Sequence, residues 1–205
     1  ERGIAHQHLK QFAAAMADYD KALQLAPNAN KAYYNRGSAK FDQRDYTGAL
    51  EDINKSLTID EADDEAYFIR AHVKMALKDY QGAVNDYNTA LFLDIKNIKV
   101  YAFRGYAESF LDGFATRMDG DFNQALKLEP QNPLVYDLRG QARINTKNIS
   151  GAMIDYNKAI GLNSKYAPAY LHRGLLKVTQ NNKAGACADL NRAALLGRSD
   201  AQGSV

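Results

Sequence analysis

Residues 30–63 read NKAYYNRGSAKFDQRDYTGALEDINKSLTIDEAD, and residues 64–97 read DEAYFIRAHVKMALKDYQGAVNDYNTALFLDIKN. The two stretches share a plan: a tyrosine near the start, an arginine followed by a small residue, and an aspartate 16 residues after that arginine. Self-similarity at a fixed period of this length indicates stacked supersecondary units, each of which buries its apolar face against its neighbours.

The arginine and the aspartate recur along the whole chain. The arginines are Arg2, Arg36, Arg70, Arg104, Arg139 and Arg173, and the aspartates are Asp18, Asp52, Asp86, Asp121, Asp155 and Asp189. Successive arginines are 34 residues apart, except for one interval of 35. We predict one continuous array: a partial repeat, 1–29, then the repeats 30–63, 64–97, 98–132, 133–166 and 167–197, and then a tail or cloning remnant, 198–205. Positions are numbered from the first residue of each complete repeat.

Each repeat is predicted to form two helices, helix A over about positions 2–14 and helix B over about positions 16–30. Small residues at positions 8, 20 and 27 alternate with bulky residues at positions 4, 17 and 24, as interlocking helices require. Position 16 carries a short polar side chain that can cap helix B in four repeats, as Asp45, Asp79, Asn148 and Asn182.

This pattern resembles the tetratricopeptide repeat over nearly the whole chain, from Glu1 to about Gly197. The features that carry the resemblance are tyrosine at position 4, glycine at 8, alanine at 20, an aromatic residue at 24, alanine at 27 and proline at 32. The resemblance implies an all-α, right-handed superhelical solenoid of antiparallel helix pairs. It also implies a concave face lined by the A helices, where members of the family commonly hold peptides or partner segments.

Three positions depart from that family's usual apolar residues. Position 7 is arginine, position 11 is Lys, Arg or Glu, and position 23 is aspartate. We predict a structural Arg–Asp pair in every repeat, because a functional anion site would not be expected six times over. The tyrosines at position 4 could form a stacking platform for single-stranded nucleic acid, but we predict that they pack between helices.

The fourth repeat has the one longer interval, because Arg104 and Asp121 are 17 residues apart. Met118 replaces the usual alanine, Gly113 replaces the capping residue, and Gly120 lies inside helix B, where glycine is unfavourable. The segment Phe110–Phe122 is therefore expected to pack unlike its neighbours and to change the twist locally. A longer turn or a π-bulge would absorb the extra residue, and the alternative to a functional role is a drifted repeat.

Residues that contact a partner are expected on the helix A stripe formed by positions 2, 5, 9 and 12, which varies between repeats while the packing positions do not. The stripe is rich in aromatic residues, which suit an apolar or mixed peptide. The candidate partner-binding residues are Lys31, Tyr34, Ser38, Phe68, His72, Lys99, Tyr106, Phe110, Asp137 and Gln141. Phe41, Met75, Ile144 and Val178 belong either to the stripe or to the packing between neighbouring A helices.

One binding mode of the resembled family is not predicted here. A carboxylate clamp for chaperone C-termini needs lysine at position 5 and asparagine at position 9 of one repeat, and no repeat has that pair. Enzyme motifs are also missing: His6 and His8 point to different helix faces, and the chain has neither a phosphate-binding glycine loop nor a nucleophile elbow. We predict no catalysis, no cofactor and no metal.

Composition agrees with a protein or peptide as the partner. The net charge is +2 and the basic residues are dispersed, so no basic surface for nucleic acid is predicted. No apolar run is long enough for membrane insertion. Cys187 is the single cysteine, which precludes an internal disulfide, and we expect it to be a small buried residue.

The chain begins at Glu1, within a repeat, and shows no signal-peptide pattern. We expect a fragment, so a targeting segment could be missing and the compartment stays open. The partial first repeat leaves Ile4, Leu9 and Phe12 uncovered, which predicts self-association through that end or further repeats upstream. The main prediction is a protein-interaction scaffold. The alternatives are an assembly adaptor that docks through its ends or convex face, and an accessory domain of a larger protein.

Overall fold

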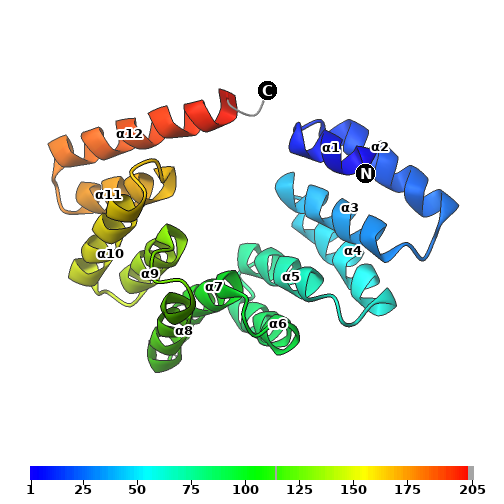
Figure 1. Cartoon of the computed structure of the whole chain (residues 1–205), viewed down its shortest axis with the longest axis horizontal. Helices are drawn as coiled ribbons and strands as arrows, with labels where there is room; N and C mark the ends of the chain where they lie inside the picture. The colour runs from blue at the N-terminus through cyan, green and yellow to red at the C-terminus, as the bar shows by residue number, and fades with distance from the viewer. Residues whose placement is uncertain (114, 203–205) are drawn as a thin grey trace. The chain divides into compact units, whose positions relative to one another are not determined.

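The computed structural model describes residues 1–113 and 115–202, which form α-helices and no strand (Figure 1). The chain divides into two compact blocks, Glu1–Asn97 and Ile98–Val205, and each is described by itself. The N-terminal block contains α1 (Arg2–His8), α2 (Phe12–Leu25), α3 (Asn30–Asp42), α4 (Tyr46–Ile59), α5 (Asp64–Ala76) and α6 (Tyr80–Leu93). The C-terminal block contains α7 (Ile98–Glu108), α8 (Ala115–Leu128), α9 (Pro133–Asn145), α10 (Ile149–Leu162), α11 (Ala167–Thr179) and α12 (Lys183–Gln202).

Each repeat is an antiparallel helix pair, as predicted, with an odd-numbered helix A and an even-numbered helix B (Figure 1). The bulky residue at position 24 packs on the small residue at position 8. A Cβ placed on Gly140 would lie 2.5 Å from the ring of Tyr156, so only glycine allows helices α9 and α10 to approach this closely. Helix α12 continues to Gln202, beyond Gly197 where the repeat pattern stops. None of the described helices is long and apolar enough to cross a membrane.

The turn between helices A and B contains a positive-φ residue in every repeat. One residue there has a left-handed backbone, and the six are Lys10, Arg44, Lys78, Gly113, Lys147 and Asn181. The predicted caps on helix B are confirmed. Asp79 Oδ1, for example, accepts a hydrogen bond of 2.9 Å from the backbone N–H of Gly82. A Cβ on Gly82 would lie 2.0 Å from the Asp79 carboxylate, so this glycine makes room for the cap.

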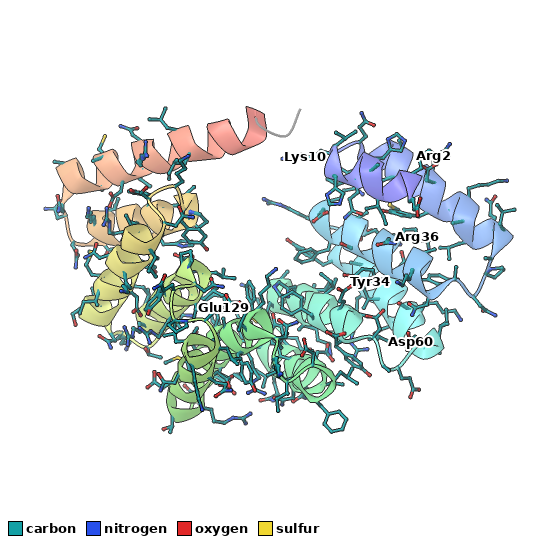
Figure 2. The ribbon with its side chains drawn as sticks, viewed as in Figure 1. Arg2, Lys10, Tyr34, Arg36, Asp60 and Glu129 are labelled. Atoms are coloured by element: carbon teal, nitrogen blue, oxygen red, sulfur yellow. The ribbon has the colours of Figure 1, made fainter. Side chains whose placement is uncertain are left out.

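The predicted Arg–Asp pair is confirmed in all six repeats. In the second repeat, Arg36 on α3 (Figure 2) donates to both carboxylate oxygens of Asp52, through Nε at 2.8 Å and Nη2 at 2.6 Å. Lys40, one helical turn further along α3, places its Nζ 2.8 Å from the same carboxylate. Burial alone would raise the pKa of Asp52, but hydrogen bonds from Arg36 and Lys40 outweigh it and lower the pKa.

The second cation was not predicted from the sequence, although it recurs. Position 11 is basic in four complete repeats, and each of these side chains reaches the aspartate of its own repeat: Lys40, Lys74, Arg143 and Lys177. A buried carboxylate that accepts from two cations is well compensated for its lost hydration. In these four repeats the aspartate at position 23 therefore binds helix B to two successive turns of helix A.

The tyrosines at position 4 belong to the scaffold, as predicted. In each complete repeat, the guanidinium of the arginine at position 7 lies over the tyrosine ring, at 5.1 Å for Arg70 over Tyr67 and at no more than 5.7 Å in the others. This distance is that of a cation–π contact. The tyrosine, the arginine and the aspartate thus form one connected set in each repeat.

The fourth repeat packs differently from the others, as expected from its extra residue. Helix α7 has 11 residues, whereas α3, α5, α9 and α11 have 13 each, so a longer turn absorbs the insertion. The Arg104–Asp121 pair is retained, with Nε 2.7 Å from Oδ2. Of the two helices of the preceding repeat, α9 packs mainly on helix A, α7, and little on helix B, α8. By contrast, α3, α5 and α11 each pack on the preceding helix B.

One sequence interpretation of this repeat needs correction. Gly113 does not replace the helix cap, because its φ of +80° places it at the left-handed turn position that Arg44 and Lys78 occupy elsewhere. Counted from Asp121, the cap position is residue 114, which lies outside the described residues. Met118 fills the alanine position and is buried, which is consistent with looser packing of α8 at that point.

The buried pair makes a quantitative prediction because Arg36 contacts two aspartates of different exposure. Its Nη2 is 2.6 Å from Asp52, whose side chain is 6% exposed, and its Nη1 is 2.6 Å from Asp20, whose side chain is 52% exposed. Asp52→Ala strands two half-buried cations and should lower the free energy of unfolding by about 3–5 kcal/mol. Asp20→Ala, the matched control, should cost about 0–1 kcal/mol. Guanidinium denaturation measures both, and equal losses would contradict the scaffold role of Asp52.

Candidate functional site

In the N-terminal block, two residues of the predicted binding stripe, Phe68 and His72, contact each other and Tyr87 within the third repeat. The rings of Phe68 and His72 have centroids 4.3 Å apart, and each lies within 5.9 Å of the Tyr87 ring. The Nδ1 of His72 is 2.9 Å from the Phe68 carbonyl oxygen and 3.2 Å from the Tyr87 hydroxyl. Burial lowers the pKa of His72, so this imidazole is neutral at physiological pH. The polar atoms of this cluster already have partners.

The second repeat contributes three predicted site residues. Tyr34 (Figure 2) packs against the core around Ile53 and Leu57. Burial raises the pKa of Tyr34 to about 12, so its hydroxyl keeps its proton. Lys31 is exposed, and Ser38 is half-buried.

In the C-terminal block, the structure separates the remaining predicted residues by their surroundings. Lys99 is exposed. Phe110 is 37% exposed, and its ring meets Tyr106 edge-on at 5.2 Å. Tyr106 and Gln141 line a cavity, and Asp137 is buried beneath them, with 2% of its surface exposed. Asp137 therefore positions other groups rather than contacting a partner itself.

The cavity has a volume of about 440 Å³ and lies on three consecutive A helices, α7, α9 and α11, together with part of α10. Its walls are mostly apolar, and the described residues that line it include only one that can carry a formal charge, His172. The lining residues are Tyr106, Gln141, Ile144, Asn145, Ile149, Tyr156, His172, Leu175, Leu176 and Thr179. A concave, largely apolar space with a few polar groups is the usual form of a binding site.

A polar network supports one side of the cavity. The Nδ1 of His172 lies 2.8 Å from Asp137 Oδ1, and the Nε2 of Gln141 donates to Asp137 Oδ2 at 3.3 Å. Tyr156 from α10 also reaches the cavity, and its ring centroid lies 6.0 Å from that of His172. Burial, and then the charge of Asp137, raises the pKa of Tyr156, so the phenol remains protonated.

Sequence reasoning missed two of the residues that bring polar atoms into this cavity, Tyr156 and His172. Tyr156 was assigned to packing because position 24 is bulky in every repeat, and His172 lies at position 6, outside the predicted stripe. A signal was present, because Asp137 is position 5 of its repeat and His172 is position 6 of the next. The two residues therefore occupy neighbouring positions on successive A helices. The contact between the two side chains became evident only from the way α9 and α11 pack in the structure.

The prediction for Cys187 was wrong. The side chain was expected to be buried because position 21 is apolar in other repeats, yet Cys187 is exposed. Helices α2, α4 and α10 each pack against the helix A that follows, whereas among the described residues no helix follows α12. Cys187 instead lines a hollow with Val178 and Leu190 on the outer face of α11 and α12.

A second departure from the scaffold lies in the fourth repeat, where Glu108 occupies the position of the second cation. Its residue is 1% exposed, and among the described residues neither carboxylate oxygen receives a hydrogen bond. The Nε of Arg117 lies 3.2 Å from Oε1, within ion-pair distance but without hydrogen-bond alignment. Burial, and then the charge of Asp121, raises the pKa of Glu108 to about 7, against the opposing effects of Arg117 and Arg104.

Comparison with protein families found two models, both described as the tetratricopeptide repeat. One matches residues 1–29, and the other matches residues 31–63, 64–94 and 134–166. Together these segments cover more than half of the chain. The fourth repeat, with its longer turn, and the sixth are not among the matched segments. A comparison with curated proteins found no match.

Solved structures share the fold at low sequence identity. A tetratricopeptide repeat protein from Parabacteroides merdae is 22% identical, with a TM-score of 0.85 over 95% of this chain and 76% of that one. The Cut9–Hcn1 hetero-tetramer of the APC/C gives 18% identity and a TM-score of 0.77 over 98% of this chain and 40% of that one. YrrB, a repeat protein titled as having an unusual peptide-binding site, gives 17% identity and a TM-score of 0.58 over 87% and 91%. The fold is therefore an all-α helical-repeat solenoid.

The Glu108 carboxylate predicts an unusual dependence of stability on pH. Because folding raises its pKa from 4.5 to about 7, its stabilising contribution is full below about pH 4.5 and is lost as the pH rises through about 7. At pH 8, Glu108→Gln should therefore unfold at a higher free energy than the parent chain, by on the order of 2–3 kcal/mol. This advantage should vanish towards pH 5.

Denaturant titrations at several pH values measure the difference. Glu108→Lys should stabilise at pH 8 as well, because it restores the second cation that other repeats place beside the aspartate. Glu51→Gln, at an exposed site on α4, is the control and should show no such trend. Parallel pH profiles for Glu108→Gln and the parent chain would show that Glu108 is not the responsible group.

Proposed function

This chain belongs to the tetratricopeptide-repeat family, and on that premise we propose that it holds a segment of a partner protein against the A helices of its C-terminal block. Proteins built from this repeat generally act as protein-interaction scaffolds rather than as enzymes. The observation that carries the proposal is the apolar cavity of about 440 Å³ on α7, α9 and α11. This cavity is concave and largely apolar, as a site that receives a partner's side chain usually is.

The walls of the cavity favour an apolar anchor from the partner. Leu175 is 51% exposed and Ile149 is 37% exposed, so covering them removes apolar surface from water. Tyr106 adds an aromatic wall, and Phe110 extends it outside the cavity. Since a few buried anchors usually dominate the binding energy of an interface, one bulky side chain of the partner would supply most of the affinity.

A rigid scaffold makes such binding economical. The A helices that carry the cavity are fixed to their B helices by buried ion pairs, as in the Arg139–Asp155 pair beside it. The free protein therefore already holds the cavity, and less ordering is required on binding. YrrB, which has the same kind of fold, is described as having a peptide-binding site, and that description agrees with a peptide as the ligand class.

The alternative function is assembly, in which the array docks on another copy or on a larger complex. Leu9 is 58% exposed and Ile4 is 37% exposed in the first repeat, so an apolar end is available. The similar Cut9–Hcn1 structure is described as an APC/C hetero-tetramer, and that description supports assembly as the alternative. This alternative would be favoured if the solution mass of the parent chain rises with protein concentration while the Leu9→Lys variant keeps the mass of a monomer.

Peptide selection from a random displayed library tests the groove proposal directly. The parent chain should enrich peptides with a bulky apolar residue. Leu175→Asp places a charge in the cavity wall and should weaken binding of the selected peptides by about tenfold or more, since a buried unpaired charge is costly. Ile154→Asp is the matched control, because Ile154 is 65% exposed on α10 and does not line the cavity.

Isothermal titration gives the affinities, and circular dichroism confirms that both variants keep their helices. If Ile154→Asp weakens binding as much as Leu175→Asp does, the selected peptides bind elsewhere and the cavity is not the site. If no sequence is enriched at all, the assembly alternative becomes the better account.

A further inference from the structure

Tyr156 differs from the equivalent tyrosines in what its hydroxyl contacts. In the first repeat the hydroxyl of Tyr19 donates to Gln7 at 3.0 Å, and in the third repeat the hydroxyl of Tyr87 is 3.2 Å from His72. Tyr156 is only 2% exposed, yet it lines the cavity, and the described residues offer its hydroxyl no hydrogen bond. The ring is buried, and the hydroxyl is a polar group of the cavity wall that a ligand can complete with a hydrogen bond.

His172 presents a second polar atom to the same space. Because the Asp137 carboxylate can only accept, the Nδ1 of His172 carries the proton of their 2.8 Å hydrogen bond. The other ring nitrogen, Nε2, is then an acceptor in the neutral imidazole, and no described residue donates to it. The phenol of Tyr156 can donate, so the cavity lining contains one donor and one acceptor, on rings whose centroids are 6.0 Å apart.

The charges around these two atoms restrict the ligand further. Asp137 from α9 is the buried anion, and the uncharged groups near it are Gln141 on the same helix, Tyr166 before α11, and Tyr156 on α10. A second anion would be repelled by Asp137. A cation could not reach Asp137, since His172 and Gln141 already occupy its oxygens. A neutral group that both donates and accepts fits best.

We infer that the cavity takes a tyrosine side chain of the partner segment, whose hydroxyl donates to Nε2 of His172 and accepts from the hydroxyl of Tyr156. The aliphatic walls, Ile144, Ile149 and Leu175, receive the ring. Phenylalanine would fill the walls but leave both polar atoms unpaired, and a carboxylate would have no proton to donate. This inference rests on the proposed function and specifies which residue of the partner segment binds in the cavity.

Capped tripeptides, acetyl-Gly-Xaa-Gly-amide, test the inference by NMR titration of the full chain. Xaa is tyrosine, phenylalanine, leucine or phosphotyrosine. The tyrosine peptide should bind about tenfold more tightly than the phenylalanine peptide, because the phenylalanine ring would cover two polar groups of the cavity wall and give them no hydrogen bond. The phosphotyrosine peptide should bind least, since its charge faces Asp137. Tyr156→Phe should reduce the preference for tyrosine, whereas the matched control, Tyr87→Phe, should leave it unchanged.

The outcomes separate this inference from the proposed function. The tyrosine, phenylalanine and leucine peptides could bind equally well and all lose binding in Leu175→Asp. That result would support the groove proposal and overturn the inference that the cavity recognises a tyrosine hydroxyl. Tighter binding of phosphotyrosine, or an unchanged tyrosine preference in Tyr156→Phe, would also overturn it. No binding of any tripeptide at millimolar concentration would count against both.

Discussion

A buried aspartate on helix B, held by two cations from helix A, is the constraint on which the scaffold depends. The two cations lie four positions apart, so both can reach one carboxylate only if a single face of helix A is turned towards helix B. The tyrosine one turn earlier lies under the guanidinium and extends the same face. Three positions of every A helix are thereby committed to structure, and variation is confined to the faces that remain.

The fourth repeat shows how strongly the ion pair is maintained. Its extra residue could have displaced Asp121 from Arg104, but the two remain bonded, and the turn before α8 lengthens instead. A longer turn costs little, whereas stranding a buried charge costs several kcal/mol. Where the second cation is replaced, by Glu108, the structure instead holds two carboxylates near one another, with Arg117 and Arg104 close by. The departure that sequence reasoning detected as an insertion is thus also an electrostatic one.

The sequence predicted the fold well because its signals are local and repeated. Helix pairs, caps such as Asp79, and the pairing of Arg36 with Asp52 all follow from residue types at fixed spacing. The candidate site followed less well. Tyr106 and Gln141 were predicted and line the cavity, but Asp137 lies beneath it, and His172 was not predicted as a site residue. Whether a tyrosine hydroxyl is satisfied depends on the residue opposite it on a different helix, which spacing alone does not reveal.

The buried ion pairs close within single repeats, and this bears on how the chain could have grown. Contacts between the arginines and the preceding repeat involve exposed side chains, as with Arg36 and Asp20, and not the buried carboxylates. A duplication or deletion of a whole repeat would therefore break no buried Arg–Asp pair. Genes for such an array can lengthen or shorten in steps of one repeat while each copy keeps its own Arg–Asp pair, and later substitutions at the variable positions can give each copy its own surface.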